Sequence, residues 1–135
     1  MLSAMMTAME SSDAAGGRLN VRLSLDAGVS VVLVSGEVDV FTCEALRVHL
    51  VRVITDEAFG GLVVDLAGVG FIDSTGIGVL VGAWHRVQAT DRRMALARPS
   101  GPVRTVLHAA HLEQILAVRD SLAAAVEDVR RSAGE

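Results

Sequence analysis

The sequence contains no lysine, although it has twelve basic residues, all of them arginine. A Walker-type phosphate loop, a Schiff-base enzyme and a protein kinase each depend on a lysine. The standard forms of these three classes are therefore excluded. Cysteine is nearly absent as well. Cys43 stands alone, which rules out an internal disulfide and fits a reducing cytosol.

Long apolar runs are also missing. The longest, residues 76–84, is far shorter than the roughly 20 residues that span a bilayer. The first residues lack the basic flank and apolar core of a signal peptide. We therefore expect a cytoplasmic protein without membrane insertion. The net charge is −4 and the arginines are scattered from Arg18 to Arg131, so direct DNA or RNA binding is not expected.

What the sequence does contain is enough apolar material for one globular domain, since 51% of its 135 residues are hydrophobic. We assign residues 18–131 to this domain. Residues 1–17 are rich in Met, Ala, Ser and Gly without periodicity, and they predict a disordered N-terminal segment. Residues 132–135 are assigned to a C-terminal tail.

Hydrophobic periodicity predicts an α/β fold. Strict alternation over residues 19–26 and a β-branched run over residues 31–34 predict two strands joined as a hairpin. Residues 68–76 are predicted as a loop. Helical spacing of apolar residues alternates with further short strands, which are expected over residues 62–66, 94–97 and 115–118. The order β-β-α-β-α-β-α-β-α implies a mostly parallel, five-stranded sheet with right-handed crossovers and helices packed against it.

The most informative segment is Asp73-Ser74-Thr75-Gly76, at the predicted start of a helix. Backbone N–H groups are unpaired there and the helix dipole is positive. One interpretation is that Asp73 or Ser74 simply caps the helix. The other is that Ser74 accepts a phosphate, which would meet free N–H donors and act as a charge switch. The two roles are compatible.

Three glycines follow along the same helix, at positions 76, 78 and 82. They remove side chains from one side of it. This pattern allows either close packing of the helix on the sheet or a low-relief surface that a partner approaches. The sequence leaves both interpretations open.

These motifs resemble a known family. Val63-Val-Asp65-Leu66, followed by Phe71-Ile-Asp-Ser-Thr-Gly76 and Gly78, resembles the signature of STAS domains, in particular the bacterial anti-sigma factor antagonists, or anti-anti-sigma factors. Gly36-Glu-Val-Asp39 followed by Thr42 is similar to a second element of that family. The resemblance covers most of the chain, and it implies the STAS fold.

The resemblance also implies a function. Ser74, or as second choice Thr75, would be phosphorylated by a cognate anti-sigma serine kinase, and a serine phosphatase would reverse the modification. The unphosphorylated form would bind the kinase and release a sigma factor, which is partner switching in transcription regulation during stress response or sporulation. Such a phosphoprotein is not an enzyme and needs no cofactor or metal. The implied partner-binding residues are Asp39, Asp73, Ser74, Thr75, Gly76 and Gly78.

Other functions stay open. STAS-like domains also serve as constitutive interaction subunits of transport systems or stress-signalling scaffolds, which would not depend on Ser74. A serine hydrolase is a further alternative, but its nucleophile elbow needs glycine where Ile72 stands. His108 and His111 lie three residues apart before Glu113, and this incomplete ligand set does not predict a metal site.

Overall fold

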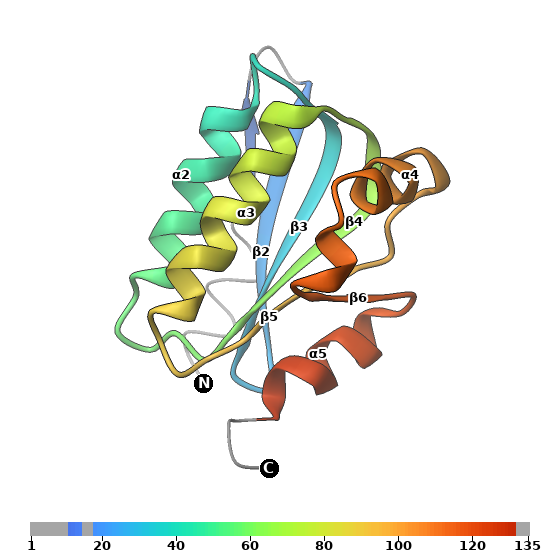
Figure 1. Ribbon diagram of the computed structural model, residues 1–135. Coiled ribbons are helices and arrows are strands. Elements are labelled where there is room, and N and C mark those ends of the chain that lie inside the picture. The colour runs from blue at the N-terminus through green and yellow to red at the C-terminus, as the bar shows by residue number, and fades with distance from the viewer. Residues whose placement is uncertain (1–10, 15–17, 132–135) are drawn as a thin grey trace.

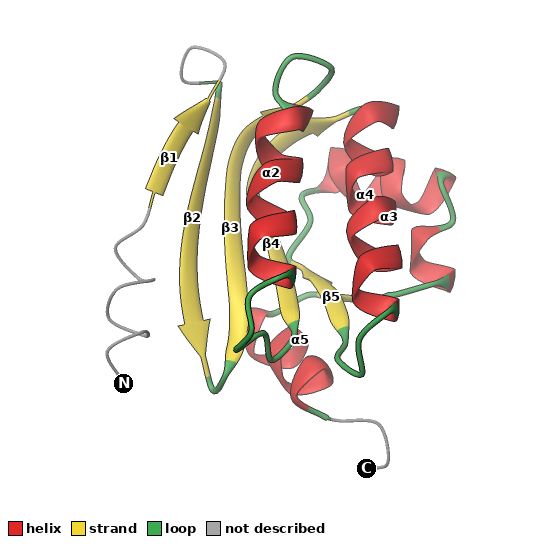
Figure 2. Cartoon of the chain, turned by 90° about the vertical axis from the view of Figure 1, so that its left-hand side faces the viewer, coloured by secondary structure: helices red, strands yellow, loops and turns green. Residues whose placement is uncertain are grey.

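The computed structural model describes residues 11–14 and 18–131, which form a mixed β-sheet covered by helices on both faces (Figures 1 and 2). Its elements are β1 (Ser11–Ala14), β2 (Leu19–Asp26), β3 (Val29–Val38), α2 (Cys43–Ile54), β4 (Leu62–Ile72), α3 (Ser74–Gln88), β5 (Met94–Ala97), α4 (Gly101–Ala109), the 3₁₀ helix η1 (Leu112–Gln114), β6 (Ala117–Arg119) and α5 (Leu122–Arg130). The α/β architecture predicted from the sequence is confirmed. The strand order is β1-β2-β3-β4-β5-β6.

The hairpin of β2 and β3 begins the predicted part of the sheet. Asp26 pairs with Val29, so the connecting loop has two residues, and both of these have positive φ: 53° at Ala27 and 86° at Gly28. Two-residue loops of this handedness match the twist of antiparallel strands. The alternating pattern of β2 and the continuous apolar run of β3 therefore fold as expected, with β3 in the interior of the sheet.

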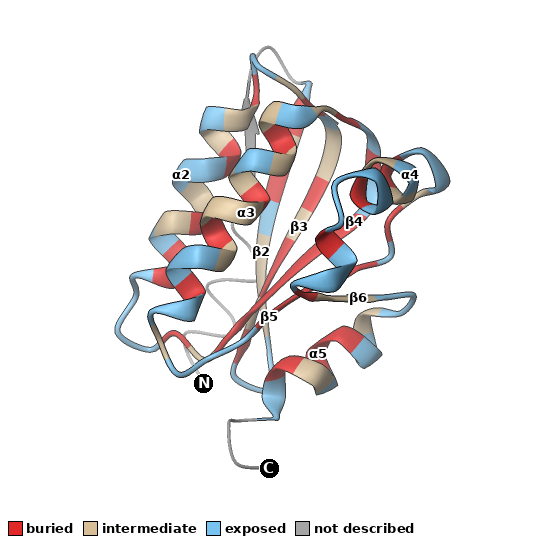
Figure 3. Cartoon of the chain, in the orientation of Figure 1, coloured by how far each residue is buried: buried red, intermediate tan, exposed pale blue. Residues whose placement is uncertain are grey.

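From β3 onward the neighbouring strands are parallel, and α2, α3 and α4 make the crossovers between them. The main core lies between the sheet and these helices, and a smaller one lies between the opposite face of the sheet and α5. Figure 3 shows buried residues concentrated in the central strands, whereas exposed residues lie on the outer sides of the helices. Parallel strands that are covered on both faces read as continuous apolar runs, as β4 does at its start.

One expectation about the N-terminal segment is wrong. Ser11–Ala14 was included in the predicted disordered segment, but it forms strand β1, antiparallel to β2. The described sheet therefore has six strands, the five predicted and this one at the edge. The open edge of β2 supplies backbone hydrogen bonds that composition does not reveal. The other residues of the segment, 1–10 and 15–17, and the tail 132–135 lie outside the described residues.

The predicted loop over residues 68–76 is also wrong for most of its length, because β4 continues to Ile72 and α3 begins at Ser74. β3 likewise continues past Gly36 to Val38, and the two strands stay paired across two register shifts. Pairing with a neighbouring strand outweighs the weak strand preference of glycine here. The last strand is displaced from residues 115–118 to Ala117–Arg119, because η1 occupies the residues before it.

Candidate functional site

The predicted site residues come together where β3 and β4 end. These strands are parallel neighbours, and the amide of Asp73 donates to the carbonyl of Val38 at 3.1 Å. Asp39 and Ser74 each follow directly, so two segments far apart in sequence meet at one edge of the sheet. We call residues 39–42 and 73–76 the carboxyl edge. Ligands of open α/β sheets bind at such carboxyl ends.

Asp73 is the N-cap of α3. Its carboxylate oxygen Oδ1 accepts hydrogen bonds from the amides of Thr75 at 3.0 Å and Gly76 at 3.2 Å, and from the Thr75 hydroxyl. The Thr75 hydroxyl, assisted by the two amides, lowers the pKa of Asp73 against the opposing effect of desolvation. The sequence left open whether Asp73 or Ser74 caps the helix, and the structure assigns this role to Asp73.

The Ser74 side chain therefore does not cap α3. It is exposed at the first position of α3, and within residues 18–131 no hydrogen bond involves its hydroxyl. The expectation that a phosphate here would meet free N–H donors is wrong for two amides, since Asp73 already occupies those of Thr75 and Gly76. A phosphate on Ser74 would instead stand beside a carboxylate and project its charge outward.

Thr75 differs from its neighbour in both burial and bonding. It is half-buried, and its hydroxyl donates to Asp73. A kinase would have to break this hydrogen bond to reach the Thr75 oxygen. The geometry therefore makes Ser74 the more accessible of the two hydroxyls.

Asp39 organises the β3–α2 loop. Its Oδ1 accepts from the amides of Phe41 at 2.9 Å and Thr42 at 3.1 Å. Thr42 is buried and precedes α2, but its hydroxyl does not cap the helix. The hydroxyl donates to the Glu37 carbonyl at 2.8 Å and accepts from the Asp39 amide at 3.0 Å. These hydrogen bonds fix the conformation of the loop.

Sequence reasoning missed residues that surround this loop. Arg18, at the start of the domain, forms ion pairs with Asp39 and with Glu37, the latter at 3.5 Å, and its guanidinium lies 5.4 Å from the centre of the Phe41 ring. Only the pairing of β2 with β3 brings Arg18 there, so no local signal predicted it. Val40 and Phe41 did carry a signal, because two large apolar residues in a turn are unusual.

These apolar side chains are exposed at the carboxyl edge. Phe41 is 73% exposed, Val40 is 60% exposed, and Phe71, two residues before Asp73, is 49% exposed. Aromatic residues are enriched in protein–protein interfaces. Exposed apolar groups therefore lie in the segment 39–42 and at the end of β4, just before Asp73.

Gly76 and Gly78, the two glycines of the motif, lie in different surroundings. A Cβ on Gly76 would lie 2.6 Å from side-chain carbons of Ile72 and Val38, so Gly76 permits α3 to pack against the strand ends. A Cβ on Gly78 would meet nothing within 4 Å. Internal packing explains Gly76, and it does not explain Gly78.

The carboxyl edge shows neither the side-chain contacts of a serine hydrolase nor those of a metal site among the described residues. Within residues 18–131, no histidine bonds to Ser74, and no group of three or more metal-ligating side chains is assembled in the described part of the chain. His108 pairs with Glu113 at 2.9 Å, outside the carboxyl edge. In the same described residues, no helix has the length and apolar character needed to cross a membrane.

Comparison with known proteins agrees with this geometry. The chain is 27% identical over 103 residues to the anti-sigma F factor antagonist of Paenibacillus polymyxa, covering 76% of this chain and 88% of that protein. It is 29% identical over 103 residues to the anti-sigma-F factor antagonist RsfB of Mycobacterium tuberculosis, covering 76% and 83%.

A solved structure is similar as well. The crystal structure of an anti-sigma factor antagonist from Mycobacterium paratuberculosis superposes with a TM-score of 0.76 at 28% identity, covering 87% of this chain and 99% of that one. The STAS domain family matches residues 20–125. Because this match spans most of the chain, the protein belongs to the STAS domain family.

Proposed function

We propose that this protein is an anti-sigma factor antagonist switched by phosphorylation of Ser74. In its unphosphorylated form it binds an anti-sigma factor that is a serine kinase, in the cytoplasm, and a sigma factor is released. Phosphorylation ends the interaction, and a serine phosphatase restores it. The relatives named as anti-sigma factor antagonists support the class of partner. The chain itself supplies a binding surface and an acceptor hydroxyl.

The observation that carries the proposal is that Asp73 and Ser74 have different roles at the start of α3. Asp73 makes the capping bonds, so the exposed Ser74 hydroxyl next to it is left free for modification. Phosphorylation of Ser74 therefore displaces no hydrogen bond of its own hydroxyl within residues 18–131. Ser74 can change its charge while the fold is kept.

The surroundings of Ser74 explain how a phosphate would act. It would add roughly −1.5 to −2 charges beside the ionised Asp73, whose lowered pKa keeps it charged at neutral pH. Val40 and Phe41 offer apolar contact area on the neighbouring loop. A partner seated on this edge would then have to bury an uncompensated anion, which is costly.

Mass spectrometry after incubation with each anti-sigma kinase of the host and ATP tests this proposal directly. Phosphate on Ser74 of the wild type is expected, with none on Ser74→Ala. Thr75→Val is the matched control, since it removes the neighbouring hydroxyl and should still be phosphorylated at Ser74. Phosphate only at other residues, or none with any kinase, would contradict the proposal.

Binding measurements complete the test. Ser74→Asp places a negative charge at the carboxyl edge and should weaken kinase binding, whereas Ser74→Ala should bind like the wild type without turnover. Equal affinity of the two variants would favour a constitutive STAS subunit of a transport or scaffold complex instead.

A further inference from the structure

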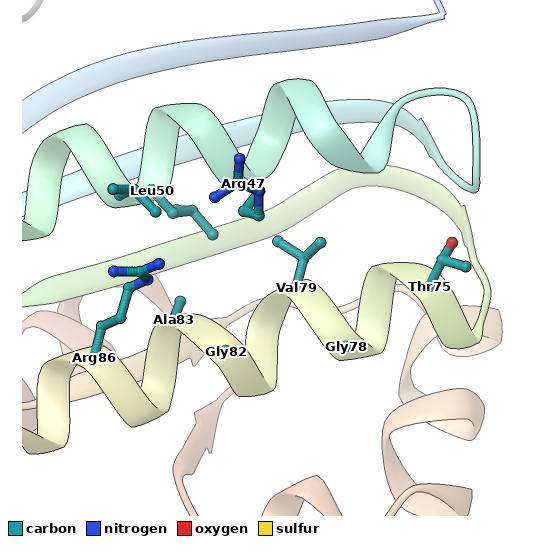
Figure 4. A pocket seen from close by; sticks show the side chains of 9 residues that line it. Arg47, Leu50, Thr75, Gly78, Val79, Gly82, Ala83 and Arg86 are labelled. Atoms are coloured by element: carbon teal, nitrogen blue, oxygen red, sulfur yellow. The ribbon is translucent and has the colours of Figure 1, made fainter.

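A groove between α2 and α3 extends away from the carboxyl edge. It encloses a cavity of about 230 Å³, and α3 borders it from Thr75 to Arg86, a length of about 16 Å. In Figure 4, Val79 points into the space between the two helices and the Arg86 side chain extends from α3 toward α2. The lining residues are Arg47, Leu50, Val51, Thr75, Gly78, Val79, Gly82, Ala83 and Arg86.

The charge of this groove is opposite to that of the whole protein. The chain carries a net charge of −4, yet the charged residues that line the groove are both arginines, Arg47 and Arg86. Arg47 forms an ion pair with Glu44 on the exposed surface of α2. Arg86 has no ion-pair partner among residues 18–131. An apolar floor flanked by a free guanidinium is complementary to a partner that combines apolar side chains with carboxylates.

Two of the α3 residues that line the groove are glycines and have no side chain. Gly78 and Gly82 lie one turn apart, and a Cβ on either would meet nothing within 4 Å. Each glycine costs about 1 kcal/mol of helix stability relative to alanine. Nothing in the packing of the described residues requires these two glycines. Their absence of side chains does allow the backbone of a second helix to approach α3 closely.

We propose that the groove between α2 and α3 binds an acidic amphipathic helix of the anti-sigma factor. The apolar face of that helix packs on Val51 and Val79, which are partly exposed, and its carboxylates pair with Arg86 and Arg47. The length of the groove fits about three helical turns, which favours a helix over a compact small molecule. The inference rests on the proposed function, because it names the part of that partner that lies beyond the Ser74 contact.

Binding of the purified, nucleotide-loaded kinase by isothermal titration calorimetry tests the groove separately from Ser74. Arg86→Glu should weaken binding about tenfold, because it places like charges opposite each other. Arg52→Glu is the matched control: Arg52 is also exposed in the last turn of its helix, on α2, but does not line the groove. Its affinity should stay within about twofold of the wild type.

A second variant, Gly82→Leu, fills the groove without removing a charge. A Cβ at position 82 meets nothing within 4 Å in the free protein, so folding should be kept, and thermal unfolding checks this. Binding should again fall by about tenfold or more. Replacing one acidic residue of the kinase helix with arginine should restore binding to Arg86→Glu.

The outcomes separate the two proposals. Wild-type affinity for Arg86→Glu and Gly82→Leu, with Ser74 still phosphorylated, would overturn the groove and leave the Ser74 switch intact. No binding of any host kinase to the wild type would overturn both.

Discussion

The carboxyl edge and the Asp65–Arg98 pair both use aspartates from β4 or the residue that follows it, yet they are built in opposite ways. Asp65 is 3% exposed, and it receives two hydrogen bonds from Arg98, 33 residues away, the Nε bond being 3.2 Å long. The Asp73 carboxylate, by contrast, accepts hydrogen bonds from Thr75 and Gly76, two and three positions away. The first arrangement ties β4 to the residue after β5, and the second completes a helix locally.

This difference shows that a buried and a surface aspartate contribute to the protein in different ways. A buried carboxylate must keep its partner, because an unpaired charge away from water is costly. The hydrogen bond with Asp65 raises the pKa of Arg98 accordingly. At the carboxyl edge the local bonds leave the Ser74 hydroxyl unbonded among the described residues and most of the Phe41 side chain exposed. We conclude that the buried pair holds the fold and that the carboxyl edge is available to a partner.

The largest expected effect is that of Arg98→Ala. It leaves Asp65 buried without its cation and should lower the free energy of unfolding by about 2 kcal/mol, less than for a fully buried pair because Arg98 is itself partly in water. Urea unfolding measures this loss. Arg92→Ala, at an exposed position before β5, should change stability by less than about 0.5 kcal/mol. Equal losses would remove the contrast between the two regions.

Next in size is the contrast between two glycines of α3. Gly76→Ala should destabilise the protein by about 1–2 kcal/mol, because its Cβ would overlap Ile72 and Val38. Gly78→Ala should stabilise by up to about 1 kcal/mol, since it gains helix propensity in open space. Thermal unfolding of both variants compares them directly. A stabilising Gly76→Ala would show that α3 is not packed tightly on the strand ends.

Loss of the helix cap should have a smaller effect that depends on pH. Asp73→Ala should cost about 1 kcal/mol at pH 7. Because hydrogen bonds lower the pKa of Asp73, its contribution is present above about pH 4 and is lost as the pH falls through the depressed value. The difference between wild type and variant should therefore shrink in acid. The difference between Asp73→Asn, which caps without titrating, and Asp73→Ala should stay constant over the same pH range.

The smallest effect is expected for Ser74→Ala, within about 0.5 kcal/mol of the wild type. Ser121 is the matched control. It is the N-cap of α5, so like Ser74 it lies at a helix start, but its Oγ accepts a hydrogen bond from the Ala124 amide at 3.0 Å. Ser121→Ala should cost about 1 kcal/mol. If Ser74→Ala were as costly as Ser121→Ala in chemical denaturation, Ser74 would be part of the fold and not a free acceptor.

Much of the fold was readable from local patterns. Alternation places β2 at its observed residues, and the apolar run over residues 31–34 lies inside the longer strand β3, because burial imposes the period on the residues. The failures are strands whose hydrogen bonds come from elsewhere. Ser11–Ala14 and the second half of β4 have compositions typical of loops, and they become strands by pairing with β2 and β3.

The candidate site was predicted in part. Asp73, Ser74 and Thr75 adjoin in sequence, so the motif was visible directly. Arg18 was not, because its contact with Asp39 spans two strands. Gly76 and Gly78 look alike in the sequence, and only their neighbours in space show that one is packed and the other is open.

By itself, the sequence determined the α/β class, the STAS motif, a chemistry without lysine, and the short segment in which Ser74, the proposed acceptor, lies. Only the tertiary structure decided that Asp73 is the cap and that Ser74 is free, since both can cap a helix and the choice depends on backbone geometry. It also brought Asp39 and Arg18 to the same edge, and it formed the cationic groove between α2 and α3. Such features arise from contacts between distant segments, which local residue patterns do not encode.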